Sequence, residues 1–238
     1  MRALLLSAGF GTRLRPLTNA IPKCLVPIGG QAVLGIWLER LTKAGVGPFL
    51  VNTHYLSEQV QAYIGASPYR DQVTLVHERE LRGTAGATID NVNFFCGQDG
   101  LLIHADNYSL ADFPEFFSAH KRRPSSCLMT MMTFRTATPS LCGIVELDTN
   151  GVVIGFHEKV SNPPGNLANG AVYYLSAELL QIIATEWGRV KDFSTEVLEK
   201  LVGRIYTYET KEIFLDIGTP ETYEQANLLA SNSTKLVV

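Results

Sequence analysis

The chain has 238 residues, 46% of them hydrophobic, which favours one large globular domain with a sizeable core. Its 20 basic and 23 acidic residues leave a net charge of −3, which argues against a nucleic-acid binder and a polybasic membrane-surface protein. The four cysteines lack CxxC spacing, so we expect reduced thiols in a cytoplasmic protein. The first apolar run breaks at Ser7, too early for a signal peptide, and no stretch approaches the ~18 apolar residues of a membrane span.

Short apolar runs alternate with helical patterns along the first half of the chain. Nearly continuous apolar runs are typical of strands that are buried on both faces of a parallel sheet. We therefore expect strands at 3–6, 49–52, 73–77, 101–105 and 128–133, and helices near 32–45, 57–65, 84–93 and 113–123. Asp112 should cap the last of these helices, since Glu115 follows at the capping-box spacing.

The second half begins with a hairpin signal, because Asn150-Gly151 separates two apolar runs at 144–148 and 152–156. A polar loop at 161–167 follows, then a strand at 171–175, a helix to about 187, a helix near 194–202, strands at 205–210 and 213–216, and a helix from Pro220 with Thr219 as its cap. This alternation predicts a single α/β domain over residues 1–230, Rossmann-like, with three layers and a mixed, mostly parallel central sheet. Residues 231–238 are expected to be a tail.

A glycine-rich stretch, Gly9-Phe10-Gly11-Thr12-Arg13, follows the first predicted strand. Glycines at this place let the backbone approach a ligand and present N–H groups to phosphate oxygens, and Arg13 and Lys23 add cations. The stretch is not a P-loop, and Leu14 stands at the third glycine of a dinucleotide fingerprint. Gly-x-Gly alone is equally explained by an ordinary strand-to-helix turn.

The longer string LLLSAGFGTRLRPLTNAIPKCLVP, residues 4–27, resembles the signature of the sugar-1-phosphate nucleotidylyltransferases. Further segments resemble the motifs of that family in order. They are a base-binding turn at 78–88 (ERELRGTAGAT), two metal-site segments at 104–107 (HADN) and 214–223 (FLDIGTPETY), and sugar-binding segments at 142–148 (CGIVELD), 156–159 (FHEK) and 169–175 (NGAVYYL).

The resemblance implies a reaction in which a nucleoside triphosphate and a sugar 1-phosphate give a nucleoside-diphosphate sugar and pyrophosphate. It also implies the nucleotide-diphospho-sugar transferase fold, with a nucleotide-binding half over about 1–110 and a sugar-phosphate-binding half over 111–230. No C-terminal β-helix is expected, because the sequence ends soon after the last motif. A homodimer is compatible with the sequence, which itself gives no oligomeric state.

The resemblance also implies the roles of individual residues. Nucleotide binding is implied for Ser7, Ala8, Gly9, Gly11, Thr12, Glu78, Glu80, Gly83 and Thr84, sugar binding for Gly143, Glu158, Asn169 and Gly170, and catalysis for Arg13, Lys23, Asp106, Lys159 and Asp216. Both reactants are polyanions, so the reaction needs cations more than a base, and Arg13, Lys23 and Lys159 would supply them. Asp106 and Asp216 would share Mg²⁺, which prefers carboxylate and phosphate oxygens.

Each of these assignments has a structural alternative. Asp106 could cap a turn, Asp216 could cap the helix that begins near Thr219, and Lys159 could pair with Glu158 on a surface hairpin. The sequence also departs from the family pattern, with Ser7 in place of Ala or Gly, Ala105 in place of Gly, Val160 in place of the Pro of E-K-P, and Asn169-Gly170-Ala171 in place of N-A-G.

The base-binding turn favours GTP, with UTP second. Guanine presents two adjacent donors to a carboxylate such as Glu78 or Glu80, whereas a pyrimidine would place a carbonyl oxygen there. Among acceptors we favour manno-heptose 1-phosphate, then mannose 1-phosphate, which would place the protein in bacterial lipopolysaccharide or capsule synthesis. The alternatives are uridylyl or thymidylyl transfer to a hexose 1-phosphate, another phosphorylated acceptor, or a non-catalytic subunit that senses nucleotide sugars.

Overall fold

The computed structural model describes residues 1–235 of the chain, with side chains to residue 231. The fold divides into two compact units, each assembled from three chain segments. The first unit comprises Met1–Leu4, Arg82–Ile103 and Ala111–Lys211, and the second comprises Leu5–Leu81, His104–Leu110 and the chain from Glu212 onwards. The division of the chain into halves near residue 110 stays a prediction, and the units themselves are discontinuous in sequence.

The second unit contains the parallel strands of the amino-terminal half. Strands β4 (Phe49–Thr53) and β5 (Val73–His77) are parallel, and β4 follows β1 (Arg2–Leu6) in the strand order. Residues Arg2–Leu4 of β1 belong to the first unit, and Leu5 and Leu6 belong to the second. Every residue of β4 is buried, as its apolar run predicts. The helices of this unit are α1 (Val33–Lys43), α2 (Ser57–Ala66) and α6 (Pro220–Lys235). Two short antiparallel strand pairs lie outside the main sheet: β2 (Pro27–Ile28) with β3 (Gln31–Ala32), and β7 (Asn107–Ser109) with β13 (Phe214–Asp216). The unit also contains the 3-10 turns η1 (Thr12–Leu14), η2 (Leu17–Asn19), η3 (Lys23–Leu25) and η4 (Arg70–Gln72).

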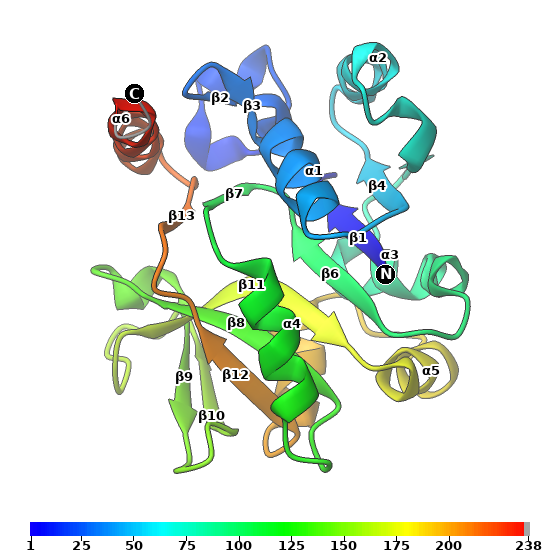
Figure 1. Ribbon diagram of the computed structural model, residues 1–238, viewed down its shortest axis with the longest axis vertical. Coiled ribbons are helices and arrows are strands. Elements are labelled where there is room, and N and C mark those ends of the chain that lie inside the picture. Colours follow the sequence, from blue (N-terminus) through cyan, green and yellow to red (C-terminus); the bar gives the residue numbers. More distant parts are fainter. Residues whose placement is uncertain (236–238) are drawn as a thin grey trace. The chain divides into compact units, whose positions relative to one another are not determined.

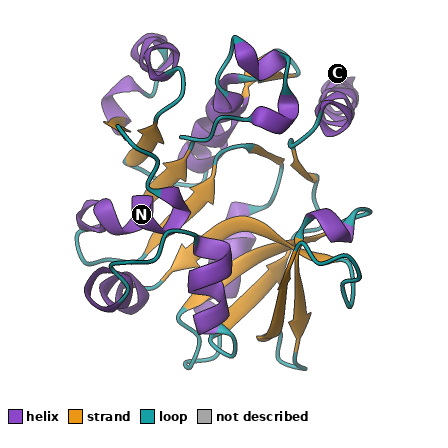
Figure 2. Cartoon of the chain, turned by 180° about the vertical axis from the view of Figure 1, so that it is seen from behind, coloured by secondary structure: helices purple, strands orange, loops and turns teal. Residues whose placement is uncertain are grey.

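The first unit is built around the long strand β11 (Leu167–Leu175), which pairs antiparallel with three strands. The strand order is β10 (Val153–Glu158), β9 (Gly143–Leu147), β11, β6 (Gly100–His104) and β1, while β8 (Met129–Arg135) also pairs with β11 and runs parallel to β12 (Ile205–Glu209). In the rear view the strands of this unit form one twisted sheet (Figure 2). The expected α/β class with a mixed sheet is confirmed.

The helices of the first unit largely follow the sequence pattern. They are α3 (Gly83–Asp90), α4 (Phe113–Arg122) and α5 (Ala177–Glu186), and α4 packs on β8 and β12 (Figure 1). The carboxylate of Asp112 accepts the Glu115 N–H at 3.0 Å, which confirms the predicted cap. The unit also contains three 3-10 turns: η5 (Val92–Phe95), η6 (Pro139–Leu141) and η8 (Glu199–Leu201).

Two expectations differ from the structure. The helix expected near 194–202 is a π-helix, η7 (Phe193–Leu198), followed by the 3-10 turn η8. The carboxylate of Glu196 accepts the N–H groups of Lys191 and Asp192, both at 2.9 Å, which fixes an unusual first turn. Helix α6 continues to Lys235, beyond the start of the tail expected at Ser231, and residues 236–238 of that tail lie outside the described residues.

In the part of the chain that the structure describes, no helix is both long and apolar enough to span a bilayer.

Candidate active site

The predicted glycine-rich loop, which we define as residues Ser7–Arg13, leaves the end of β1 in the second unit. Gly11 adopts a left-handed conformation with φ +63°, and a Cβ there would lie 3.0 Å from the side chain of Thr18 and 3.1 Å from that of Lys23. Only glycine fits this combination without strain. At Gly9 a Cβ would meet no atom within 4 Å, so the backbone there faces open space. At Gly9 the loop therefore has the exposed backbone that phosphate binding requires, while Ala8, also in the loop, is buried.

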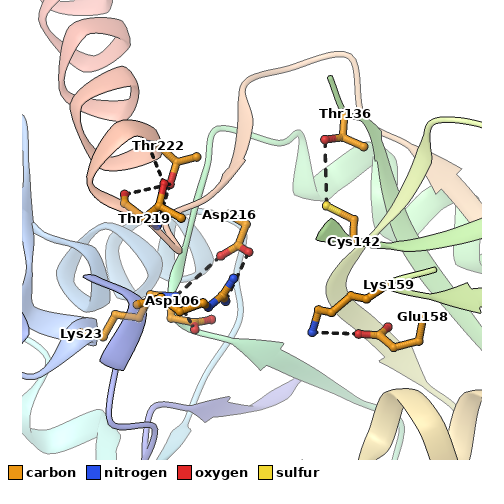
Figure 3. A network of polar contacts seen from close by, with 10 residues as sticks. Lys23, Asp106, Thr136, Cys142, Glu158, Lys159, Asp216, Thr219 and Thr222 are labelled. Carbon is orange, nitrogen blue, oxygen red and sulfur yellow. Dashed lines mark hydrogen bonds and ion pairs between the residues drawn. The ribbon is translucent and has the colours of Figure 1, made fainter. Parts of the chain in front are cut away.

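Four of the five predicted catalytic residues form one charged cluster in the second unit. The Lys23 Nζ lies 2.7 Å from Asp106 Oδ2 and 3.7 Å from Asp216 Oδ1 (Figure 3). The Arg13 guanidinium lies 3.8 Å from the other Asp216 oxygen. Two cations and two carboxylates thus alternate next to the glycine-rich loop, and we call these four residues the charged cluster.

The pairing of two short strands brings the two aspartates together. Strand β13 runs antiparallel to β7, with Asp216 opposite Asn107, so Asp106 is the next residue along from the partner of Asp216. Lys23 reaches the same point from η3. The indole N–H of Trp37 donates to the Asn107 carbonyl at 2.9 Å in the core, which anchors this turn.

The Lys23 side chain gives the charged cluster its electrostatic centre. Lys23 is only 9% exposed, so its charge is poorly screened by water. Burial by itself would raise the pKa of Asp106, but the charges of Lys23 and His104 outweigh burial, and the pKa is lowered. Asp106 is therefore an ionised carboxylate at neutral pH. Burial raises the pKa of the neighbouring Cys24 thiol to about 12, so Cys24 is no nucleophile there.

Gly218 is a site residue that the sequence argument missed. A Cβ at this buried position would lie 3.1–3.2 Å from three atoms of the Arg13 guanidinium. The absence of a side chain at 218 therefore leaves the space in which Arg13 reaches Asp216. The segment FLDIGTP contains this glycine, but no role was predicted for Gly218 from the sequence.

Replacing Gly218 with valine is expected to displace Arg13 and to weaken triphosphate binding about tenfold, the effect of losing one charge-assisted hydrogen bond. Equilibrium binding of a non-hydrolysable triphosphate analogue measures this effect. Gly188→Val is the matched control, because a Cβ at Gly188 would meet no atom within 4 Å. Unchanged affinity in Gly218→Val would show that the position of Arg13 does not depend on Gly218.

The two acidic residues predicted to bind the base lie in different environments within the second unit. Glu78 is 7% exposed, and its Oε1 accepts a hydrogen bond from the Asn52 side chain at 2.7 Å. Glu80 is exposed. Asn52 was not among the predicted site residues, although a polar residue at the carboxyl end of a buried strand is a recognisable signal.

Gly83 and Thr84 begin helix α3 in the first unit. Gly83 has φ +74°, and a Cβ there would lie 2.3 Å from the Lys191 carbonyl oxygen, which accepts the Ala85 N–H at 2.9 Å. The Thr84 hydroxyl accepts the Phe193 N–H at 2.7 Å. These contacts join the start of α3 to the segment before η7, and the predicted role in nucleotide binding stays a prediction.

Three predicted residues of the sugar-phosphate side also meet in the first unit. Glu158 of β10 lies opposite Gly143 of β9, and a Cβ at Gly143 would lie 2.6 Å from Glu158 Oε2. The Lys159 ammonium lies 2.9 Å from the other Glu158 oxygen (Figure 3). Lys159 has φ +50°, rare for a residue with a side chain, and its N–H donates to the Cys142 carbonyl at 3.1 Å. Gly143 thus leaves the space in which Glu158 orients the exposed Lys159.

The segment Asn169-Gly170-Ala171 forms a bulge in β11. Pairing with β8 is interrupted between Asn169 and Tyr173, and Gly170 is buried within the interrupted stretch. The Asn169 amide donates to the Tyr173 hydroxyl at 2.8 Å, and its oxygen accepts the Ala171 N–H at 2.9 Å. Tyr173 is fully buried, and burial raises the pKa of its phenol. Asn169 therefore shapes the bulge, and its contact with sugar stays a prediction.

Ala171 occupies a left-handed position with φ +52°, at the place where the N-A-G pattern has glycine. We expect Ala171→Gly to raise the free energy of unfolding by about 0.5–1 kcal/mol, because relief of left-handed strain exceeds the added entropy of the unfolded chain. Urea unfolding measures this. Ala168→Gly is the control, since Ala168 is buried and paired with Ile144, and it should lose stability. A destabilised Ala171→Gly would contradict the explanation.

A family model described as Nucleotidyl transferase matches residues 2–233. Among curated proteins, the mannose-1-phosphate guanylyltransferase of Mycobacterium tuberculosis is 28% identical over 93% of this chain and 62% of its own length. The chain thus spans about three-fifths of the curated relatives that it matches.

Solved structures share the fold along nearly the whole chain. A glucose-1-phosphate thymidylyltransferase candidate from Bacillus anthracis, in complex with a sucrose, superposes with a TM-score of 0.82 and 20% identity, covering 97% of this chain and 95% of that one. HddC from Yersinia pseudotuberculosis superposes with a TM-score of 0.81 and 25% identity, covering 96% and 98%. HddC has also been solved in complex with GMP-PN. These likenesses confirm the expected Rossmann-like fold.

Proposed function

The chain belongs to the nucleotidyl transferase family, and on that premise we propose that it transfers a nucleotidyl group from a nucleoside triphosphate to a sugar 1-phosphate and releases pyrophosphate. The observation that carries the proposal is the charged cluster of Arg13, Lys23, Asp106 and Asp216 beside the glycine-rich loop. An exposed glycine at residue 9 and fixed cations next to paired carboxylates suit a reaction between two phosphates.

In the proposed reaction an oxygen of the sugar phosphate attacks the α-phosphorus of the triphosphate. A new phosphorus–oxygen bond forms, the bond to the β-phosphate bridging oxygen breaks, and its electron pair leaves with pyrophosphate. Arg13 and Lys23 hold the triphosphate and stabilise the charge that develops on pyrophosphate, while Lys159 binds the sugar phosphate. No general base is needed, because the attacking phosphate is already an anion at neutral pH.

The residues present suit Mg²⁺, the cofactor that the resemblance of the sequence motifs implies. Asp106 and Asp216 direct carboxylate oxygens at a single ammonium, so their charges converge on one point. Among the described residues no third His, Cys, Asp or Glu joins them in a metal-binding group, and phosphate oxygens of the substrates would complete the shell of a hard cation. When bound, Mg²⁺ would polarise phosphoryl oxygens and offset their charge.

We propose GTP as the nucleotide and a mannose-type sugar 1-phosphate, mannose or manno-heptose, as the acceptor. Support comes from the name of the relative from M. tuberculosis and from the HddC complex with GMP-PN. Thymidylyl transfer is the second candidate, because the neighbour from B. anthracis carries that name.

The test is release of pyrophosphate by the purified protein with Mg²⁺. Five triphosphates, GTP, UTP, dTTP, CTP and ATP, are crossed with the 1-phosphates of mannose, glucose, N-acetylglucosamine and manno-heptose. Release that requires one triphosphate and one sugar phosphate together supports the proposal, and the pair names the substrates. A folded protein that binds triphosphate and releases no pyrophosphate with any of these acceptors would overturn it.

A further inference from the structure

The buried carboxylate of Glu78 is engaged by the protein itself. Glu78 follows strand β5 and is 7% exposed, and the Asn52 Nδ2 donates to its Oε1 at 2.7 Å. Asn52 is 3% exposed and lies in β4, the strand between β1 and β5 in the sheet. A hydrogen bond between two buried groups contributes more to stability than an exposed one. If one partner is removed, the other stays buried with no water to replace the lost bond.

The same Asn52 side chain holds the start of the glycine-rich loop. Its Oδ1 accepts the Ser7 N–H at 2.7 Å, and the Ser7 hydroxyl donates to the Asn52 carbonyl at 2.6 Å. A backbone N–H can only donate and a carboxylate can only accept, so the two partners fix which end of the amide faces each of them. Glu78 thereby sets the orientation in which Asn52 binds Ser7.

The backbone of Glu78 supports the same segment. Its N–H donates to the Thr53 carbonyl at 2.8 Å, and the His54 Nδ1–H donates to the Glu78 carbonyl at 2.7 Å. Phe10, in the middle of the loop, packs its ring against those of His54 and Tyr55, with centroids 5.4 and 5.7 Å apart. The segment that Glu78 braces therefore contacts the loop both at its first residue and at Phe10.

We propose that Glu78 and Asn52 are positioning residues for triphosphate binding. Glu78 orients the Asn52 side-chain amide, and Asn52 holds Ser7, the first residue of the glycine-rich loop. This inference rests on the proposed function, because it assigns the loop to the triphosphate. It also replaces the expected role of Glu78, since a bond within the protein supports every nucleotide equally, whereas a contact with the base would discriminate among them.

Exchange of charge between the two positions tests the proposal. In Asn52→Asp two carboxylates face each other, and we expect binding of non-hydrolysable analogues of GTP, UTP and ATP to weaken about tenfold or more, each to a similar extent. In the double variant that adds Glu78→Gln, the glutamine amide donates to the carboxylate introduced at position 52, and that carboxylate still accepts the Ser7 N–H. Affinity should return to within about threefold of wild type. The KM for triphosphate should follow the affinity, with a smaller change in kcat.

The single variant Glu78→Gln separates positioning from base recognition. Its amide oxygen can accept the bond from Asn52 but carries no charge and no longer fixes the orientation of the Asn52 amide, so we expect the affinities for all triphosphates to weaken by a similar factor, about threefold to tenfold, with an unchanged order of preference among them. Glu58→Gln, an exposed carboxylate-to-amide change on α2, is the matched control. Glu78→Gln also decides the question if Asn52→Asp does not fold.

Two results would overturn the proposal: a changed order of triphosphate preference in Glu78→Gln, or a double variant as weak as folded Asn52→Asp. Failure of the proposed function is distinguishable from both. A wild-type protein that binds triphosphate analogues and shows the rescue, yet releases no pyrophosphate, loses only the proposed reaction. A wild-type protein that binds no triphosphate removes the function and this inference together.

Discussion

Lys23→Met is expected to lower kcat/KM for pyrophosphate release by about 10²–10³-fold, the loss that follows removal of one preorganised hydrogen-bond donor to a developing negative charge. Lys23 is 9% exposed, and its ammonium lies 2.7 Å from Asp106 and 3.7 Å from Asp216. Methionine keeps most of the length of the side chain and removes its charge. The two carboxylates then lose their nearest cation, and the triphosphate loses one of the two cations proposed to hold it, so the effect should exceed that of an exposed lysine outside the site. Steady-state kinetics with the substrates found in the pyrophosphate assay measure the loss.

Lys43→Met is the matched control for this prediction. Lys43 is a largely exposed lysine on α1 that pairs with Glu39 one helical turn away, and it has no part in the charged cluster. Its removal should leave kcat/KM unchanged. Activity of Lys23→Met within about threefold of wild type would remove Lys23 from the site.

Asp106→Asn is expected to reduce turnover to background while the unfolding midpoint stays near that of wild type. The lowered pKa of Asp106, in which the charge of Lys23 outweighs burial, keeps the carboxylate ionised at neutral pH and available to a hard cation. Asparagine retains an oxygen that can accept the 2.7 Å hydrogen bond from Lys23 but removes the charge. Activity as a function of Mg²⁺ concentration and urea unfolding of the same preparation separate the two effects.

Asp71→Asn provides the control, because Asp71 is an exposed carboxylate on η4 whose ion pair with Arg70 is open to water. It should retain both activity and stability. If Asp106 serves only to shape the turn before β7, then Asp106→Asn will keep its activity. Loss of folding in Asp106→Asn would instead assign the carboxylate to stability.

Most elements of the fold follow from local pattern. The apolar runs at 49–52 and 101–105 predicted buried strands, and the structure has β4 (Phe49–Thr53) and β6 (Gly100–His104) there. The cap at Asp112 follows from the chemistry of its side chain. At 194–202 the sequence pattern correctly predicted a helix, but the structure has a π-helix followed by a 3-10 turn in place of an α-helix. There the Glu196 carboxylate accepts two backbone N–H groups that precede the helix, and the Lys191 carbonyl accepts an N–H of α3; neither contact is visible in a periodicity.

The site divides in the same way. The residue types were predictable: glycines, arginine and lysine for phosphates, and aspartates for a divalent cation. Their arrangement was not, because Asp106 and Asp216 are 110 positions apart and meet only through the register of two three-residue strands. Gly218 and Asn52 escaped notice for the same reason, since what they do depends on Arg13 and Ser7 arriving from elsewhere in the chain.

The sequence alone therefore determined the alternation of strands and helices, the family, and the chemistry of the reactive side chains, because these depend on composition and spacing along the chain. The tertiary structure decided which of those side chains form ion pairs with one another and which are hydrogen-bonded to other residues of the protein. Lys23 is shared between two aspartates, whereas Glu78 is bonded to Asn52. The physical reason is that hydrogen bonds and ion pairs act over about 3–4 Å in space, a scale that sequence separation does not set.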